Sequence, residues 1–164
     1  MADIARQIHS TDSACIAIAQ LDHRGRQQLV ADKFGDCTGP SAVPSPILEK
    51  TARELSPDEI QDVIDCFVNA ILRVKKAGFD GVQLHAAHGK LLSSFLSPYT
   101  NQRTDDYGGS LENRMRIISE IVTRGRELVG DFPIMVKINC DDFVPVGLTP
   151  SCLQSMWQPW RRSA

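Results

Sequence analysis

The chain has 164 residues, and 42% of them are hydrophobic, which is enough apolar material for one globular core. Its 18 basic and 20 acidic side chains are spread along the chain, which disfavours binding to nucleic acid. No apolar run approaches the ~18 residues that cross a membrane, and the amino terminus lacks the pattern of a signal peptide. The five cysteines form no C-x-x-C pair, which favours reduced thiols over disulfides or a zinc ribbon. We therefore expect a cytoplasmic protein.

The first third of the chain predicts a helix, a strand and a long connection. A helical pattern runs from Ala2 to about Ser10. Ala14 to Leu21 (ACIAIAQL) is a continuous apolar run, as expected of a strand buried on both faces. Residues Asp22 to Leu55 contain several Gly and Pro and show no periodicity, so they predict a long connection.

The clearest predicted helix begins after Ser56, which supplies an N-cap. Pro57 suits the first helical position, and Glu59 stands where a capping box needs it. Gly78 predicts the end of the helix, and Phe79 to Leu84 (FDGVQL) predicts the next strand. The apolar stripe of the helix comprises Ile60, Val63, Ile64, Phe67, Val68, Ile71 and Leu72.

A second capped helix and a third strand follow a long polar loop. Ser110 is the expected N-cap, and Gly130 with Pro133 predicts the end of the helix. Pro133 to Asn139 (PIMVKIN) predicts a third buried strand. Alternating strands and helices indicate an α/β fold with parallel strands, in which chemistry gathers at the carboxyl ends. The stripe of this helix comprises Leu111, Met115, Ile118, Val122 and Val129.

Polar segments lie at or after the carboxyl end of each of the three predicted strands. They are Gln20 to Arg26, His85 to Lys90, and Lys137 to Asp142. An amide, two histidines and a lysine at one end of a sheet are suited to bind a polar ring system and an anionic oxygen.

One long segment resembles a known family. Gly78 to Arg116 (GFDGVQLHAAHGKLLSSFLSPYTNQRTDDYGGSLENRMR) is very similar to the signature of the Old Yellow Enzyme family. QLDHRGR at Gln20 to Arg26 resembles the strand-three motif of that family, and VKIN at Val136 to Asn139 matches its strand-five position. The resemblance implies a (β/α)8 TIM barrel, of which this chain would supply about strands three to five. Residues 1–150 would form this partial FMN-binding domain, and residues 151–164 a divergent tail.

The resemblance also implies a reaction and its residues. The family holds FMN and passes a hydride from NADH or NADPH to the flavin, and then to an activated alkene such as an α,β-unsaturated carbonyl. By position, His85 and His88 resemble the pair that hydrogen-bonds the carbonyl oxygen of the substrate. Their i, i+3 spacing on one helical turn would aim both imidazoles the same way. Gln20 corresponds to a glutamine that pairs with the flavin pyrimidine, and Lys137 to a cation near the flavin N1 and O2 atoms.

Lys90 departs from the family pattern. It stands where many members have the tyrosine that protonates the substrate, and a lysine is suited to this role only if burial lowers its pKa. Protonation by solvent, or loss of the reductase half-reaction in which the alkene is reduced, is the alternative. The phosphate-binding loops of the family follow strands seven and eight, which this chain would not supply, so we expect the chain alone to bind FMN weakly or not at all.

Two other functions remain open at this stage. The first is an inactive remnant or assembly partner that uses exposed sheet edges for self-association or binds a completing chain. The second is a metal-dependent barrel hydrolase, although His85 and His88 lack a third ligand at diagnostic spacing, so no metal is expected. Asp141 and Asp142 are expected to be solvated, and Pro159 to break a helix in the tail. The polar signature residues expected to brace the loop are Asn101, Arg103, Asp105, Tyr107, Glu112, Asn113 and Arg114.

Overall fold

The structure is a computed structural model that describes residues 1–30, 37–46 and 48–160, apart from the side chains of residues 153 and 157–160. Parts of the expected long connection and the last four residues of the tail lie outside these ranges. The elements are α1 (Ala2–Thr11), β1 (Ile18–Leu21), the 3-10 helix η1 (Gly25–Gln27), β2 (Thr38–Gly39), β3 (Arg53–Glu54), α2 (Pro57–Lys76), β4 (Gly81–Ala86), α3 (Leu91–Leu96), α4 (Leu111–Val129), β5 (Ile134–Ile138) and α5 (Pro150–Trp160).

The chain divides into two compact units. The first comprises Met1–Asp22, Ser56–His85 and Ile118–Lys137. The second comprises His23–Leu55, Ala86–Ile117 and Ile138–Ala164. The first unit contains nearly all of β1, β4 and β5, and the second contains the segments that follow these three strands in the chain.

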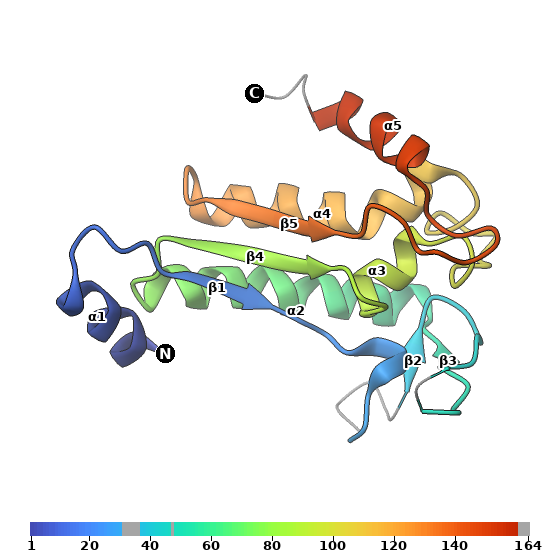
Figure 1. Cartoon of the computed structure of the whole chain (residues 1–164), viewed down its shortest axis with the longest axis horizontal. Coiled ribbons are helices and arrows are strands. Elements are labelled where there is room, and N and C mark those ends of the chain that lie inside the picture. The colour runs from blue at the N-terminus through green and yellow to red at the C-terminus, as the bar shows by residue number, and fades with distance from the viewer. Residues whose placement is uncertain (31–36, 47, 161–164) are drawn as a thin grey trace. The chain divides into compact units, whose positions relative to one another are not determined.

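A three-stranded sheet in the order β1-β4-β5 forms the centre of the first unit. Strands β1 and β4 are parallel, and their register places Gln20 opposite Gln83. Figure 1 shows β1, β4 and β5 as neighbouring arrows that point the same way. The expected α/β arrangement with parallel strands is therefore present.

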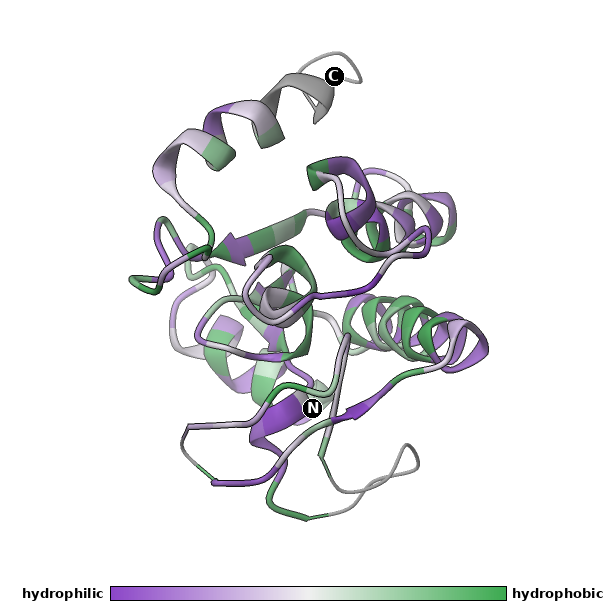
Figure 2. Cartoon of the chain, turned by 90° about the vertical axis from the view of Figure 1, so that its right-hand side faces the viewer, coloured by the Kyte–Doolittle hydropathy of each residue, from purple (hydrophilic) through white to green (hydrophobic). Residues whose placement is uncertain are grey.

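Helices α2 and α4 pack against one face of this sheet. The periodic stripe of α2 includes Ile60, Val63 and Ile71, which are fully buried, as is Val82 of β4. A side chain at Gly125 of α4 would meet Ile71, which shows how closely the two helices approach. Figure 2 shows apolar and polar residues on opposite sides of the long helices. The predicted amphipathic stripes therefore make the core of this unit.

The other face of the sheet is open along β1 and β5, which corrects the prediction that these two strands are buried on both faces. Residues of β1 and β5 alternate between exposed and half-buried. Ile18 is 39% exposed and Met135 is 37% exposed. The apolar run that starts at Ala14 also begins before its strand, and Ile16 within it is 74% exposed. The prediction failed because apolar composition does not reveal which face of a strand other elements cover.

The predicted helix ends are confirmed. The Ser56 hydroxyl accepts from the Glu59 amide at 3.2 Å, and the Glu59 carboxylate accepts from the Ser56 amide at 2.8 Å. The Ser110 hydroxyl accepts from the Asn113 amide at 3.2 Å. Gly78 follows α2 with φ +82°, a conformation that strains any residue with a Cβ. These ends could be predicted because each depends on residues a few positions apart.

The second unit contains short elements that the sequence analysis missed. Strands β2 and β3 form a two-stranded parallel sheet, with Thr38 opposite Arg53. Helix α3 occupies part of the expected polar loop, and all six of its residues are buried. Helix α5 continues to Trp160, so the prediction that Pro159 would break the helix is wrong. Pro159 lies in the last turn of α5.

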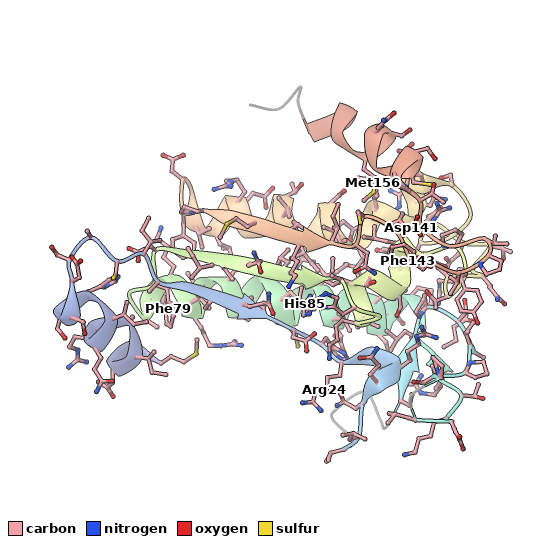
Figure 3. The ribbon with its side chains drawn as sticks, viewed as in Figure 1. Arg24, Phe79, His85, Asp141, Phe143 and Met156 are labelled. Carbon is pink, nitrogen blue, oxygen red and sulfur yellow. The ribbon has the colours of Figure 1, made fainter. Side chains whose placement is uncertain are left out.

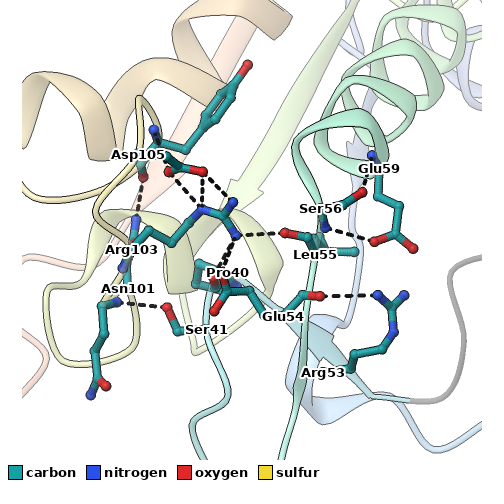
Figure 4. Close-up of polar contacts among 12 residues, drawn as sticks. Pro40, Ser41, Arg53, Glu54, Leu55, Ser56, Glu59, Asn101, Arg103 and Asp105 are labelled. Atoms are coloured by element: carbon teal, nitrogen blue, oxygen red, sulfur yellow. Dashed lines mark hydrogen bonds and ion pairs between the residues drawn. The ribbon is translucent and has the colours of Figure 1, made fainter.

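The buried guanidinium of Arg103 joins three segments of the second unit. It donates to the carbonyl oxygens of Pro40 at 2.9 Å and Leu55 at 2.7 Å. It also pairs with Asp105 at 2.5 Å and with Glu54 at 3.2 Å, as Figure 4 shows. Because a buried cation is costly without partners, these acceptors hold the segments together.

The amide of Asn101 and the guanidinium of Arg114 brace the same loop. Asn101 donates to the carbonyl oxygens of Phe95 at 2.8 Å and Tyr107 at 2.7 Å. Arg114 donates to the Leu96 carbonyl oxygen at 2.8 Å. The bracing role predicted for the polar signature residues is confirmed for Asn101, Arg114, Arg103 and Asp105.

Within the described ranges, none of the helices has the length and apolarity that a membrane crossing requires.

Removal of the Ser56 cap is expected to destabilise the fold. Ser56→Ala leaves an amide of α2 without its acceptor and should lower the free energy of unfolding by about 1 kcal/mol. Urea denaturation followed by circular dichroism measures the change. Ser10→Ala is the matched control, because the Ser10 hydroxyl only bonds back to the Gln7 carbonyl oxygen of its own helix. Equal stability of the two variants would contradict the capping assignment.

Asp105 should make stability dependent on pH in the acid range. The hydrogen bond from Arg103 is the main cause that holds the pKa of the Asp105 carboxyl below its usual value. Its contribution is therefore complete above the unfolded pKa of ~3.9 and is lost as the pH falls through the lower folded pKa. Asp105→Asn should flatten the fall in unfolding free energy below about pH 4. Asp131→Asn, at an exposed position, is the control. In urea denaturation at the same pH values, its unfolding free energy should fall with decreasing pH as that of the wild type does.

Candidate functional site

Two glutamine side chains meet on the open face of the first unit's sheet. The Gln20 amide donates to the Gln83 side-chain oxygen at 2.6 Å. Their pairing follows from the register of β1 and β4, which places the two residues opposite each other. The pair presents a carbonyl oxygen and an NH₂ group from adjacent strands. Gln83 was not predicted as a site residue from the sequence. Its position two residues before His85 could have indicated it, because residues i and i+2 of a strand lie on the same face.

His85 and Lys137 lie near the carboxyl ends of β4 and β5. Val82 of β4 donates to the carbonyl oxygen of Pro133, which immediately precedes β5, so the two strands begin at the same level. His85 shares the face of Gln83, because strand side chains alternate, and it is 7% exposed. Lys137 is exposed and alternates with the half-buried side chains of β5. Figure 3 shows His85 near the carboxyl end of β4.

The sheet therefore brings together three predicted residues of the first unit. Gln20, His85 and Lys137 come from three neighbouring strands, one from each. They supply an amide, an imidazole and an ammonium at one end of the sheet. Such a set can hydrogen-bond a polar ring edge and stabilise negative charge on it.

His88 belongs to the second unit, in the turn between β4 and α3. Its backbone has φ +57°, in the left-handed region, and its side chain is exposed. The prediction that His85 and His88 share one helical turn is therefore wrong, because His85 lies in a strand. Sequence spacing did not distinguish a helical turn from a strand followed by a tight turn.

Lys90 is the N-cap residue of α3 and is half-buried. The side chain makes no capping hydrogen bond to the helix. Its proposed role as a proton donor stays a prediction.

A cavity of about 530 Å³ lies in the second unit beside His88. Arg26 forms part of its wall and donates to the Pro44 carbonyl oxygen at 3.0 Å. Burial lowers the pKa of the Arg26 guanidinium from its usual value. The cavity wall also includes Gln27, Ser93, Ser94, Ser97, Tyr99 and Thr100, none of which the sequence analysis proposed as a site residue.

Asp141 and Asp142 are not simply solvated, which corrects that prediction. The Asp142 carboxylate accepts from the Asn139 amide at 3.1 Å and from the Leu148 backbone at 2.8 Å. Asp141 accepts from the Phe143 backbone at 2.7 Å. Both carboxylates fix the loop after β5, where Figure 3 labels Asp141 and Phe143. Local sequence could not predict the bonds of Asp142, because they depend on how the loop folds back on itself.

A parallel α/β sheet with its polar side chains at the carboxyl strand ends is the arrangement of a barrel or open-sheet enzyme. Comparison with known proteins specifies which. A model of the NADH:flavin oxidoreductase / NADH oxidase family matches residues 1–151, and the chain belongs to this family. FMN is the flavin that gives the family model its name.

Similar proteins agree with this assignment. An NADPH dehydrogenase of Bacillus pumilus is 45% identical over 129 residues, which are 79% of this chain and 37% of that protein. An NADH oxidase of Thermoanaerobacter brockii is 43% identical over 149 residues, covering 90% of this chain and 23% of that protein. The chain therefore spans well under half the length of either relative.

Solved structures show the same fold. A 2-naphthoyl-CoA reductase complex aligns with TM-score 0.89 and 32% identity over 99% of this chain and 26% of that chain. An old yellow enzyme homologue from Zymomonas mobilis aligns with TM-score 0.79 and 32% identity over 93% of this chain and 45% of that chain. The resemblance to the Old Yellow Enzyme family and the partial TIM-barrel fold are confirmed.

The residues on the open sheet face fit the polar edge of FMN. A flavin pyrimidine ring carries carbonyl oxygens and an N–H group, and the Gln20–Gln83 pair offers an amide donor and acceptor at adjacent positions. Lys137 adds an exposed positive charge on β5, the strand beside β4. The donor set is therefore of the kind that this cofactor requires.

Proposed function

We propose that the chain is part of an FMN-dependent NAD(P)H oxidoreductase that reduces the activated C=C bond of an α,β-unsaturated carbonyl compound. The observation that carries the proposal is the convergence of Gln20, His85 and Lys137 at the carboxyl end of one parallel sheet. Family membership supports the flavin and the nicotinamide donor. The spacing of the five cysteines favours a reducing compartment, and we assign the protein to the cytoplasm on that ground.

Each polar residue of the sheet has a distinct role in this proposal. Bound FMN would accept hydride from the nicotinamide and deliver it to the alkene. Gln20 would bind the pyrimidine edge through its amide, which its contact with Gln83 orients. Lys137 would supply a positive charge that stabilises the negative reduced flavin.

The two histidines serve the substrate. By resemblance to the family, the role of each imidazole is to donate an N–H to the carbonyl oxygen of the substrate, which gains negative charge as hydride attacks the β-carbon. The family tyrosine is replaced by Lys90, so the α-carbon takes its proton from this half-buried ammonium or from water.

A second candidate function rests on the sheet edges. Strands β1 and β5 are the two edges of the sheet, and Ile18 and Met135 are partly exposed on them. Such edges bind other strands readily. An inactive assembly partner that completes its sheet with another chain, or with a second copy of itself, would use them.

The family assignment favours flavin chemistry over the third alternative, metal-dependent hydrolysis.

FMN binding by the purified chain tests the proposal. Added FMN should show quenched fluorescence and a perturbed visible spectrum. Gln20→Leu should weaken binding about tenfold, because the flavin amide contact is lost and its polar edge is left unpaired. Gln7→Leu, an exposed position on α1, is the matched control and should bind as the wild type does. A chain that binds no FMN at any concentration tried, and elutes as an assembly, would instead support the second candidate.

The histidines are tested in the flavin-loaded form. Phenols bind such sites through their oxygen and give a charge-transfer absorbance with the flavin. His85→Ala with His88→Ala should abolish this absorbance, because both donors are removed. His9→Ala is the control, because His9 lies on α1 and contacts Asp80, which precedes the amino end of β4. Unchanged phenol binding in the double variant would remove both histidines from the site.

A further inference from the structure

The backbone of His88 needs support from its surroundings. With φ +57°, it adopts a conformation that residues with a Cβ rarely occupy. Such a conformation persists only where neighbouring groups hold it. His88 begins a two-residue turn with Gly89, which also has a positive φ of +69°. The backbone sets the direction of the Cα–Cβ bond, and this bond limits the positions that the imidazole can reach.

Asn139 holds the amide side of His88. Its side-chain oxygen accepts from the His88 backbone N–H at 3.0 Å. Its NH₂ group donates to Asp142 at 3.1 Å, which fixes the orientation of the Asn139 amide. Asp142 in turn accepts from the Leu148 backbone at 2.8 Å, and its own backbone N–H donates to the Leu148 carbonyl oxygen at 3.0 Å. The acceptor for His88 is therefore anchored by the folded loop after β5.

Gln27 holds the carbonyl side of His88. Its side-chain NH₂ donates to the His88 carbonyl oxygen at 2.9 Å. A Cβ at Gly89 would lie 2.7 Å from that nitrogen, so the glycine leaves the room that the bond needs.

The 3-10 helix η1 brings Gln27 into place. Gly25 in η1 has φ +57°, and a Cβ there would lie 2.9 Å from the Leu91 Cα atom. The Leu91 backbone donates to the His23 carbonyl oxygen at 2.9 Å. The absent side chain at Gly25 therefore lets η1 pack directly against the start of α3.

We propose that Gln27 and Asn139 are positioning residues that clamp the His88 peptide and so fix the direction of its imidazole. The two side chains come from the segments after β1 and β5, and His88 lies in the segment after β4. His88 lines the cavity of about 530 Å³, where a substrate oxygen would meet it. The catalytic consequence rests on the proposed function, whereas the clamp itself does not.

The first test measures the backbone of His88 by nuclear magnetic resonance in the full chain without flavin. Asn139→Leu removes the acceptor, and Gln27→Leu removes the donor. Each should shift the His88 amide signal and change its HN–Hα coupling, while the signals of His9 stay in place. Gln28→Leu is the matched control for Gln27→Leu, because Gln28 is half-buried and its side chain forms no hydrogen bond with the described residues. Unchanged His88 signals in both leucine variants would overturn the clamp.

A double variant separates positioning from simple destabilisation. Asn139→Asp with Asp142→Asn exchanges the two side chains, and the exchange can keep all three bonds, to His88, between the pair, and to Leu148. Its net charge is that of the wild type. We expect its His88 signals to stay at the wild-type positions. If the leucine variants fail to fold, this variant decides: wild-type signals support the clamp, and displaced signals overturn it.

The second test uses the flavin-loaded form and phenol as the probe. Asn139→Leu should raise the phenol dissociation constant about tenfold, because a displaced imidazole makes a poorer hydrogen bond. The exchanged double variant should restore it. Wild-type phenol affinity in Asn139→Leu, together with lost affinity in His88→Ala, would overturn the positioning role. Wild-type affinity in His88→Ala would refute the proposed function instead, and the resonance result on the clamp would stand.

Discussion

The buried guanidinium of Arg103 is the constraint on which the second unit depends. A charge with 7% exposure is tolerated only when its donors are satisfied, and here the acceptors come from residues 40, 54, 55 and 105. Two segments that precede α2 in the chain, at Pro40 and at Glu54–Leu55, are thereby tied to the loop that precedes α4. Gly108 packs against the Arg103 backbone so closely that no side chain fits there. The turn that carries His88 thus belongs to a unit whose loops are held together by hydrogen bonds and ion pairs.

The candidate site uses two kinds of support. Gln20, His85 and Lys137 stand on strands, whose hydrogen-bonded ladder fixes their positions. His88 stands on a turn, where side-chain hydrogen bonds to its peptide replace the ladder. Both kinds hold polar groups still before any ligand arrives, which is what charge stabilisation at a reacting oxygen requires.

Local patterns predicted much of this structure, and non-local contacts account for what they missed. The cap at Ser56 and the stripe of α2 depend on residues three or four positions apart, so sequence was sufficient. Other elements determine which face of β1 is covered, and the apolar run of this strand does not indicate that face. The left-handed backbone of His88 depends on Asn139, 51 residues away. The family resemblance located the catalytic candidates, whereas it gave no account of what holds them.

Strand β4 also limits how the length of this segment can change. Val82 and Leu84 are fully buried and alternate with Gln83 and His85 on the open face. Inserting or deleting a single residue within the strand would exchange the two sets, turning the polar groups inward and the apolar ones outward. Length changes are therefore tolerated in pairs, or in the turns at either end. Geometry alone predicts that related sequences vary β4 by substitution and not by insertion of a single residue.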